Sequence, residues 1–125
     1  MSSVYLTGTV AGTYHGLSGF PDNPEKPQQV VVTVQVRQSS AFAPFVRAVL
    51  WCGEGEAGER RAAEVRRAFA RNTVIGLVGQ AITYCARSNN LTVRGLQEIH
   101  TTTPSDEVVI FNSLRPEATE PTTTP

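Results

Sequence analysis

The alternation of valine with other residues from Gln29 to Arg37 constrains the fold of this chain more than any other feature. Valine recurs at every second position, at 30, 32, 34 and 36, and this spacing places side chains on one face of a β-strand. β-branched side chains also favour strands, because they pack well on a pleated surface. The segment therefore predicts a strand with one buried face, which needs neighbouring strands to complete a sheet.

Further segments predict the neighbours of this strand. Val4–Val10 and Phe45–Cys52 also alternate with period two. Thr73–Thr83 and Leu91–Ile99 are apolar enough for a fourth and a fifth strand, and the glycines at 76 and 79 are typical of a bend, as at a barrel corner. Ala11–Gln28 has glycines at 12, 16 and 19 and prolines at 21, 24 and 27, so it predicts a long loop.

One helix is expected, over Glu56–Arg71, because Ala62, Val65, Ala68 and Phe69 form a single apolar stripe. Its arginines suggest either a phosphate-binding helix or a solvated face partly neutralised by glutamates, and we expect the second. The sequence thus predicts an all-β fold with one helix. Five strands with the helix between the third and the fourth correspond to the OB-fold, a five-stranded Greek-key barrel.

The charge of the chain is unevenly distributed. The formal net charge of the 125 residues is zero, which on its own argues against nucleic acid as a partner. However, ten basic and seven acidic residues give residues 1–99 a charge of +3, whereas residues 100–125 carry −3. We therefore predict an OB-fold domain over 1–99 and an acidic tail over 100–125, rich in proline and threonine and largely disordered. Residues 107–112 are an apolar island that either closes the domain as a short strand, which we slightly favour, or docks on a partner.

Several classes of protein do not match the sequence. There is no run of about 20 apolar residues and no signal-peptide pattern, so we expect a cytoplasmic protein without a membrane partner. Phosphate-loop, nucleophile-elbow and HExxH motifs are absent, so we do not expect an enzyme. A zinc site would need Cys52, Cys85, His15 and His100 to converge from distant positions, so we predict neither metal nor cofactor.

Four segments resemble the family of bacterial single-stranded DNA-binding proteins, which includes a primosomal replication protein. Val4-Tyr-Leu-Thr-Gly8 is similar to the opening strand of the family and Phe45-Val-Arg-Ala-Val-Leu-Trp-Cys-Gly53 to its third strand. Arg71-Asn-Thr-Val-Ile-Gly-Leu-Val-Gly-Gln80 is similar to the segment that ends in a Gly-Gln pair, and Asn90-Leu-Thr-Val-Arg94 stands where the last strand belongs. The resemblance spans residues 4–99. It implies an OB-fold that binds single-stranded DNA with little sequence preference, in DNA replication, recombination or repair.

The resemblance also indicates which residues would bind DNA. Phe45 and Trp51 fall where the family has base-stacking aromatics, Arg47 lies between them, and Tyr84 lies near a third stacking position. Bases need flat apolar surfaces and the DNA backbone needs positive charge, so Arg37, Arg87 and Arg94 are candidates for the same groove. Tyr14 and Phe20, in the predicted first loop, are candidates for additional contacts. Phe45 and Trp51 could alternatively pack in a subunit interface or under the first loop.

The family assembles as tetramers or dimers, and Tyr5, Thr7 and Thr9 on the first strand are the pairing residues that we expect. The chain departs from the family in two places. Its hairpin at 86–90 is short, and its tail ends in Thr-Thr-Thr-Pro instead of an acidic tip with phenylalanine, which leaves open whether the tail recruits replication or repair proteins. The alternative function is an OB-fold protein-interaction module that has lost strong DNA binding. If the chain binds DNA, we expect it to be associated with the nucleoid.

Overall fold

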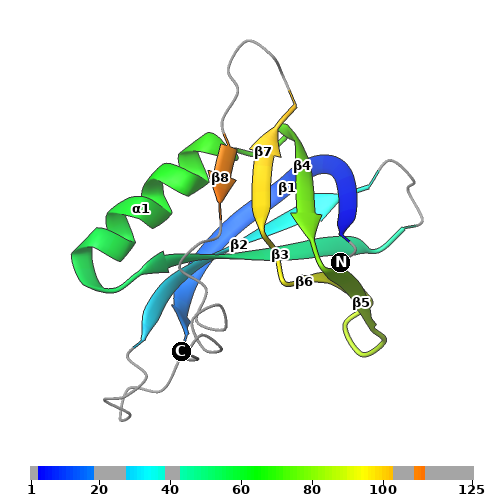
Figure 1. Cartoon of the computed structure of the whole chain (residues 1–125), viewed down its shortest axis with the longest axis horizontal. Coiled ribbons are helices and arrows are strands. Elements are labelled where there is room, and N and C mark those ends of the chain that lie inside the picture. The colour runs from blue at the N-terminus through cyan, green and yellow to red at the C-terminus, as the bar shows by residue number, and fades with distance from the viewer. Residues whose placement is uncertain (1–2, 19–27, 39–42, 103–108, 112–125) are drawn as a thin grey trace, which may run out of the picture.

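The computed structural model describes residues 3–18, 28–38, 43–102 and 109–111, which form a mostly β structure with a single helix (Figure 1). The elements follow in the order β1 (Val4–Ser18), β2 (Gln29–Arg37), β3 (Phe45–Gly53), α1 (Gly55–Ala68), β4 (Val74–Gly79), β5 (Ala81–Cys85), β6 (Asn90–Arg94), β7 (Glu98–Thr101) and β8 (Val109–Phe111).

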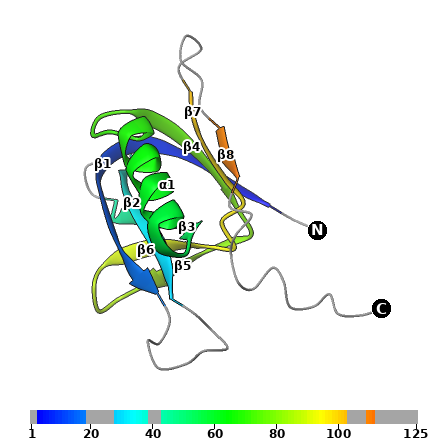
Figure 2. The same cartoon turned by 90° about the vertical axis from the view of Figure 1, so that its left-hand side faces the viewer.

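All the strands belong to one sheet, in the order β5-β6-β3-β2-β1-β4-β7-β8. β1 is long enough to pair with two strands: residues 4–9 pair with β4 and residues 9–18 with β2, both antiparallel. β3 pairs antiparallel with β2 and parallel with β6, which in turn pairs with β5. β5 follows β4 after the single residue Gln80, and β4 pairs with β1. Gln80 therefore connects the two ends of the row β5-β6-β3-β2-β1-β4. The sheet consequently curls into a half-barrel, and α1 lies in front of the curled strands in Figure 2.

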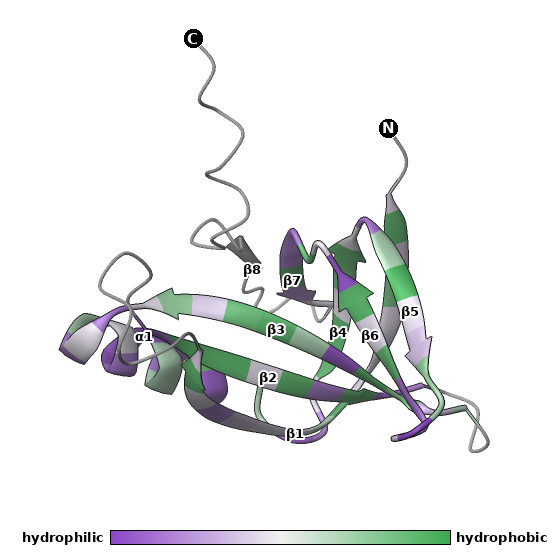
Figure 3. Cartoon of the chain, turned by 90° about the horizontal axis from the view of Figure 1, so that it is seen from below, coloured by the Kyte–Doolittle hydropathy of each residue, from purple (hydrophilic) through white to green (hydrophobic). Residues whose placement is uncertain are grey.

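The core is built from the alternation seen in the sequence. The four valines of β2 are buried, as are every second residue of β3, from Val46 to Cys52, and the helical residues Ala62 and Val65. Figure 3 shows the same alternation as apolar and more polar segments along β2 and β3. Full burial of one such aliphatic side chain contributes about 1.5–3 kcal/mol. The sheet therefore has a buried face toward the core and α1, and an outer face on β1, β2 and β3.

The predicted loop over residues 11–28 is wrong for its first part, because β1 continues to Ser18. The glycines at 12 and 16 lie within this strand, where Gly12 pairs with Gln35 and Gly16 with Val31. The valine-rich β2 needs an antiparallel neighbour along its whole length, and this pairing outweighs the low strand propensity of glycine. The remainder of the predicted loop, residues 19–27, lies outside the described residues.

The other predicted boundaries also change. The helix begins at Gly55 and ends at Ala68 instead of Arg71, since the chain then turns through Asn72, whose φ of 77° is left-handed and whose N–H donates to the carbonyl of Val10. The predicted fourth strand divides at Gln80 into β4 and β5. The predicted fifth divides at 95–97 into β6 and β7, where Gly95 has a φ of 62°. With β8, the described residues form eight strands instead of five.

The predicted boundary between domain and tail, at residue 99, falls inside β7. β8 lies within the predicted apolar island and pairs antiparallel with β7, so residues of the predicted tail extend the sheet. Residues 112–125 lie outside the described part of the chain. In the described part, no helix is long and apolar enough to cross a membrane.

Candidate nucleic-acid interface

The outer face of β1, β2 and β3 brings together several of the predicted binding residues. Antiparallel pairing sets three rows of residues side by side, and partners across a row share a face of the sheet. One row contains Gly12, Gln35 and Arg47, the next Tyr14, Thr33 and Val49, and the third Gly16, Val31 and Trp51. We call these nine residues, with Phe45 at the start of β3, the outer patch.

Arg47 and Tyr14 interact across the outer patch. The Arg47 Nη2 donates a hydrogen bond to the Tyr14 hydroxyl at 3.2 Å, although the two residues lie on strands separated by β2. The side chain of Tyr14 is 45% exposed and that of Phe45 is 40% exposed, while Arg47 and Trp51 are half-buried. Aromatic surface and a guanidinium group are thus available to solvent on one face of the sheet.

The patch continues onto the β5–β6 hairpin. Arg47 pairs with Thr92 and Phe45 with Asn90 across the parallel contact between β3 and β6. Thr92 pairs in turn with Thr83, and Asn90 with Cys85. Residues with hydroxyl, amide and thiol groups therefore extend the face beside Arg47.

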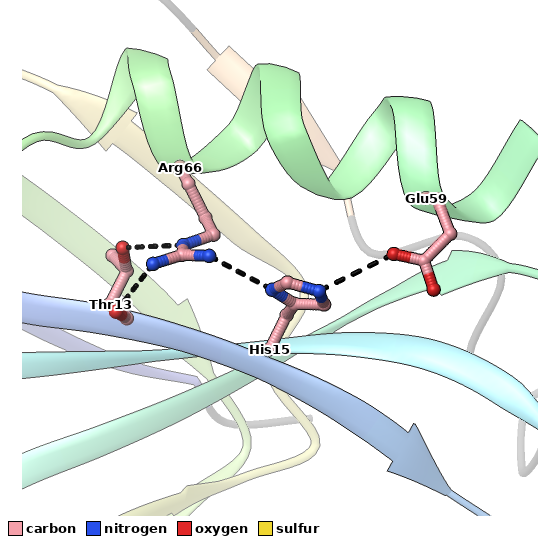
Figure 4. A network of polar contacts seen from close by, with 4 residues as sticks. All are labelled: Thr13, His15, Glu59 and Arg66. Carbon is pink, nitrogen blue, oxygen red and sulfur yellow. Dashed lines mark hydrogen bonds and ion pairs between the residues drawn. The ribbon is translucent and has the colours of Figure 1, made fainter.

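A polar network on the other face of β1 holds this strand against the helix (Figure 4). Arg66 of α1 donates from Nε to the Thr13 hydroxyl at 3.3 Å and from Nη2 to the Thr13 carbonyl at 3.3 Å. The His15 ring bridges two helical side chains: its Nδ1 lies 2.9 Å from the Arg66 Nη1, and its Nε2 lies 3.3 Å from the Glu59 Oε1. Because Tyr14 stands between Thr13 and His15, these contacts fix the strand segment that presents it.

The remaining predicted binding residues lie further from this centre. Arg37 is exposed at the end of β2, Arg94 is exposed at the end of β6, and Arg87 is exposed in the hairpin turn. Tyr84 is 56% exposed and donates to the Asn89 Oδ1 at 2.8 Å. It pairs with Leu91 and alternates with Thr83 and Cys85, so it lies on the opposite face of the hairpin and does not join the outer patch. Phe20 lies outside the described residues.

The residues predicted to pair subunits lie on a different part of the sheet. Tyr5, Thr7 and Thr9 share the outer side of the β1 segment that pairs with β4, where Tyr5 is 58% exposed. The Tyr5 ring stacks on His100 of β7 with centroids 5.9 Å apart, and its hydroxyl lies 3.3 Å from the His100 Nε2. The His100 Nδ1 lies 2.7 Å from the Glu98 Oε2, so the contacts run from Tyr5 of β1 over β4 to His100 and then along β7.

The two cysteines have different environments. Burial raises the pKa of Cys52, and Arg61 offsets part of this effect. Cys85 is exposed, and its pKa is lowered, first by a hydrogen bond from the Ser88 side chain and then by backbone hydrogen bonds from Ser88 and Arg87. Neither cysteine takes part in a metal-binding cluster, since no group of three or more potential ligands converges within the described ranges.

Sequence reasoning missed several residues of this region. Gly12 and Gly16 are not recognised in the sequence as neighbours of Arg47 and Trp51, because residues 11–18 predict a loop. The sequence also does not give the register of β2 and β3, which sets Gln35 beside Arg47 and Thr33 beside Val49. Arg66 and Glu59 are exposed, as expected of a solvated helical face, but both also contact β1, which the sequence does not indicate. The polar, aromatic and polar side chains of Thr13, Tyr14 and His15 alternate as in a strand, but the glycines on both sides favour the prediction of a loop. Comparison of the chain with protein-family models, with curated proteins and with solved structures finds no match.

Proposed function

We propose that the chain is an OB-fold protein, related to the bacterial single-stranded DNA-binding proteins, which binds single-stranded DNA with little sequence preference. The order of pairings supports the OB-fold, because β1 pairs with β2 and β4, and β3 pairs in parallel with the later strand β6. If β4 and β5 together are counted as the fourth strand and β6 as the fifth, the order of pairings is the one expected of the five-stranded OB-fold. Its role would lie in DNA replication, recombination or repair.

The observation that carries the proposal is the juxtaposition of Tyr14, Arg47 and Trp51 on the outer patch. Single-strand binding without sequence preference requires aromatic platforms, because every base has a π-face, and each stacked base contributes about 1–3 kcal/mol. It also requires positive charge along the backbone. Arginine meets both needs, since its guanidinium group can pair with phosphate or stack on a base.

The face occupied by Tyr5 supports assembly of the protein as a homo-oligomer. Tyr5, Val74 and Val109 are exposed apolar side chains on the same side of β1, β4 and β8. They lie on a part of the sheet that the outer patch does not use, so pairing of subunits there would leave the outer patch accessible.

Quenching of Trp51 fluorescence by oligo(dT) tests the proposed function directly, because Trp51 is the single tryptophan of the chain. We expect saturable quenching that weakens as salt is added. Trp51→Phe removes the reporter and keeps an aromatic ring, so its binding, measured by anisotropy of a labelled oligonucleotide, should stay near that of the wild type. Trp51→Ala should weaken binding by about 5-fold or more.

A double-stranded oligonucleotide of the same length is the control ligand, and it should bind less tightly because its bases are already stacked. An unchanged Trp51 signal, combined with no salt-sensitive binding of the labelled oligonucleotide, would contradict the proposed function. It would favour the protein-interaction module instead.

A further inference from the structure

Tyr14 occupies an unusual position on the outer patch, because both of its neighbours on the same face of β1 are glycines. Side chains alternate along a strand, so the residues that flank Tyr14 on its own face are Gly12 and Gly16. Glycine inside a strand costs about 0.5–1 kcal/mol relative to alanine, and its presence marks a bulge, a bend, or a place where a ligand or another backbone approaches closely.

The other described glycines of the chain have evident structural reasons. Gly53, Gly55 and Gly95 have positive φ angles. A Cβ at Gly8, Gly58, Gly76 or Gly79 would overlap neighbouring atoms, for example the Tyr5 hydroxyl and the His100 ring above Gly76. Gly12 and Gly16 differ in both respects. Neither has a positive φ. Apart from the glycine itself and its two chain neighbours, no described residue has an atom within 4 Å of a Cβ built at either position.

The bulge in β1 does not account for these two glycines. The register shifts between Val10 and Gly12, so the extra residue is Ala11, and from Gly12 to Ser18 the pairing with β2 is regular. Folding alone therefore does not require glycine at either position.

The dimensions of a strand suit a nucleobase in these positions. Residues two apart on a strand are about 6.6 Å apart, and stacked bases are spaced by about 3.4 Å. A missing side chain on either flank of Tyr14 thus leaves room for one flat ring against the strand backbone. Gly16 lies in the same row as Trp51, and Gly12 lies in the same row as Arg47. One open side of Tyr14 therefore has an aromatic ring in its row and the other a guanidinium group, and both groups can contact single-stranded DNA.

We propose that Tyr14 is a base-stacking residue and that Gly12 and Gly16 are base-binding positions, whose missing side chains admit unpaired bases on either side of its ring. This inference rests on the proposed function, since it assigns the place at which bases enter the same surface. The network of Thr13, His15 and Arg66 behind the strand positions Tyr14 for this contact.

Gly12→Val and Gly16→Val test the inference, because each fills one flank with a side chain that favours strands. We expect each variant to retain the wild-type circular dichroism spectrum and thermal midpoint, or to raise the midpoint. Each should weaken oligo(dT) binding, measured by Trp51 quenching and by anisotropy, by about 5-fold or more, which corresponds to the loss of one stacked base. Ala63→Val adds the same side chain at an exposed position of α1 and should bind like the wild type.

The outcomes separate this inference from the proposed function. If the wild type binds oligo(dT) and both valine variants bind with unchanged affinity, the inference is overturned and the proposed function stands. If the wild type does not bind at all, the proposed function fails first. Should the valine variants not fold, Tyr14→Leu replaces the ring by an aliphatic side chain at an exposed position. A 5-fold or greater loss of affinity then supports the inference, and wild-type affinity overturns it.

Discussion

At the scale of single residues, the chemistry of the outer patch depends on how side chains are held rather than on which residue types are present. The chain has ten arginines, and among those that the structure describes, Arg47 is the one whose guanidinium group is tied to an exposed tyrosine on the same face of the sheet. A side chain already fixed in this way loses less conformational entropy when a ligand binds. Local contacts of this kind also distinguish Cys85 from Cys52.

Cys85 should be the reactive cysteine of the chain. The hydrogen bond from the Ser88 side chain is the largest of the effects that lower its pKa, so more of it is thiolate at a given pH than in an unperturbed cysteine. Its rate of alkylation by iodoacetamide should therefore rise with pH through a midpoint below that of an unperturbed cysteine. Mass spectrometry of the modified peptide follows each cysteine separately.

Ser88→Ala should move this midpoint upward, because it removes the strongest stabilisation of the thiolate. Cys52 is the internal control. It is buried and its pKa is raised, so it should react only after unfolding. Faster modification of Cys52 than of Cys85 in the folded protein would contradict this account.

At the scale of the elements, close backbone contact determines how the helix is joined to the sheet. Gly58 lies in the second turn of α1, and a Cβ at this position would overlap the carbonyl oxygen of Gly53 at the end of β3 and would lie 3.0 Å from the Val30 Cγ2. The helix therefore packs on the end of β3 through bare backbone. Further along, Arg66 and Glu59 join the same helix to β1.

Gly58→Ala should destabilise the protein, although alanine is the better helix former by about 1 kcal/mol. The added methyl group meets backbone atoms, which cannot move aside as a flexible side chain would, and overpacking of this kind costs about 1–3 kcal/mol. Urea unfolding followed by circular dichroism measures the change in the free energy of unfolding. Glu64→Ala, at an exposed position of the same helix, should change it by less than about 0.5 kcal/mol. A more stable Gly58→Ala variant would show that the contact with Gly53 is not restrictive.

At the scale of the whole molecule, the boundary between positive and negative charge does not coincide with a boundary between a folded domain and a separate tail. Residues 1–99 carry +3 and residues 100–125 carry −3, but β7 and β8 place part of the second range in the sheet. Removal of residues 100–125 would cut β7, so a truncation that tests the role of the tail must begin after Phe111. A small positive charge on the body means that stacking must supply much of the proposed affinity.

The salt dependence of oligo(dT) binding should accordingly be modest. If about three or four phosphates are neutralised per subunit, log K should fall with log[salt] at a slope of about −2 to −3. Titrations followed by Trp51 quenching between about 50 and 200 mM salt would then show a loss of affinity of about 15- to 60-fold. Arg94→Gln, at an exposed arginine of β6, should make the slope shallower by about 0.7 if that residue contacts a phosphate. A slope near zero would mean that the wild type binds without phosphate contacts, against the proposed mechanism.

The sequence by itself determined the strands with a buried face and the side chains that each turns outward. Apolar side chains alternate so regularly in Val30 to Val36 and Phe45 to Trp51 that, once one face of each strand is buried, the residues between must face outward. The predicted bounds of Gln29–Arg37 are also the observed ones. Only the tertiary structure decided that β1 continues through its glycines to Ser18 and brings Tyr14 to Arg47. The physical reason is that a segment containing glycine has little intrinsic preference for the strand conformation. Its conformation is set instead by pairing with β2, which the local sequence does not reveal.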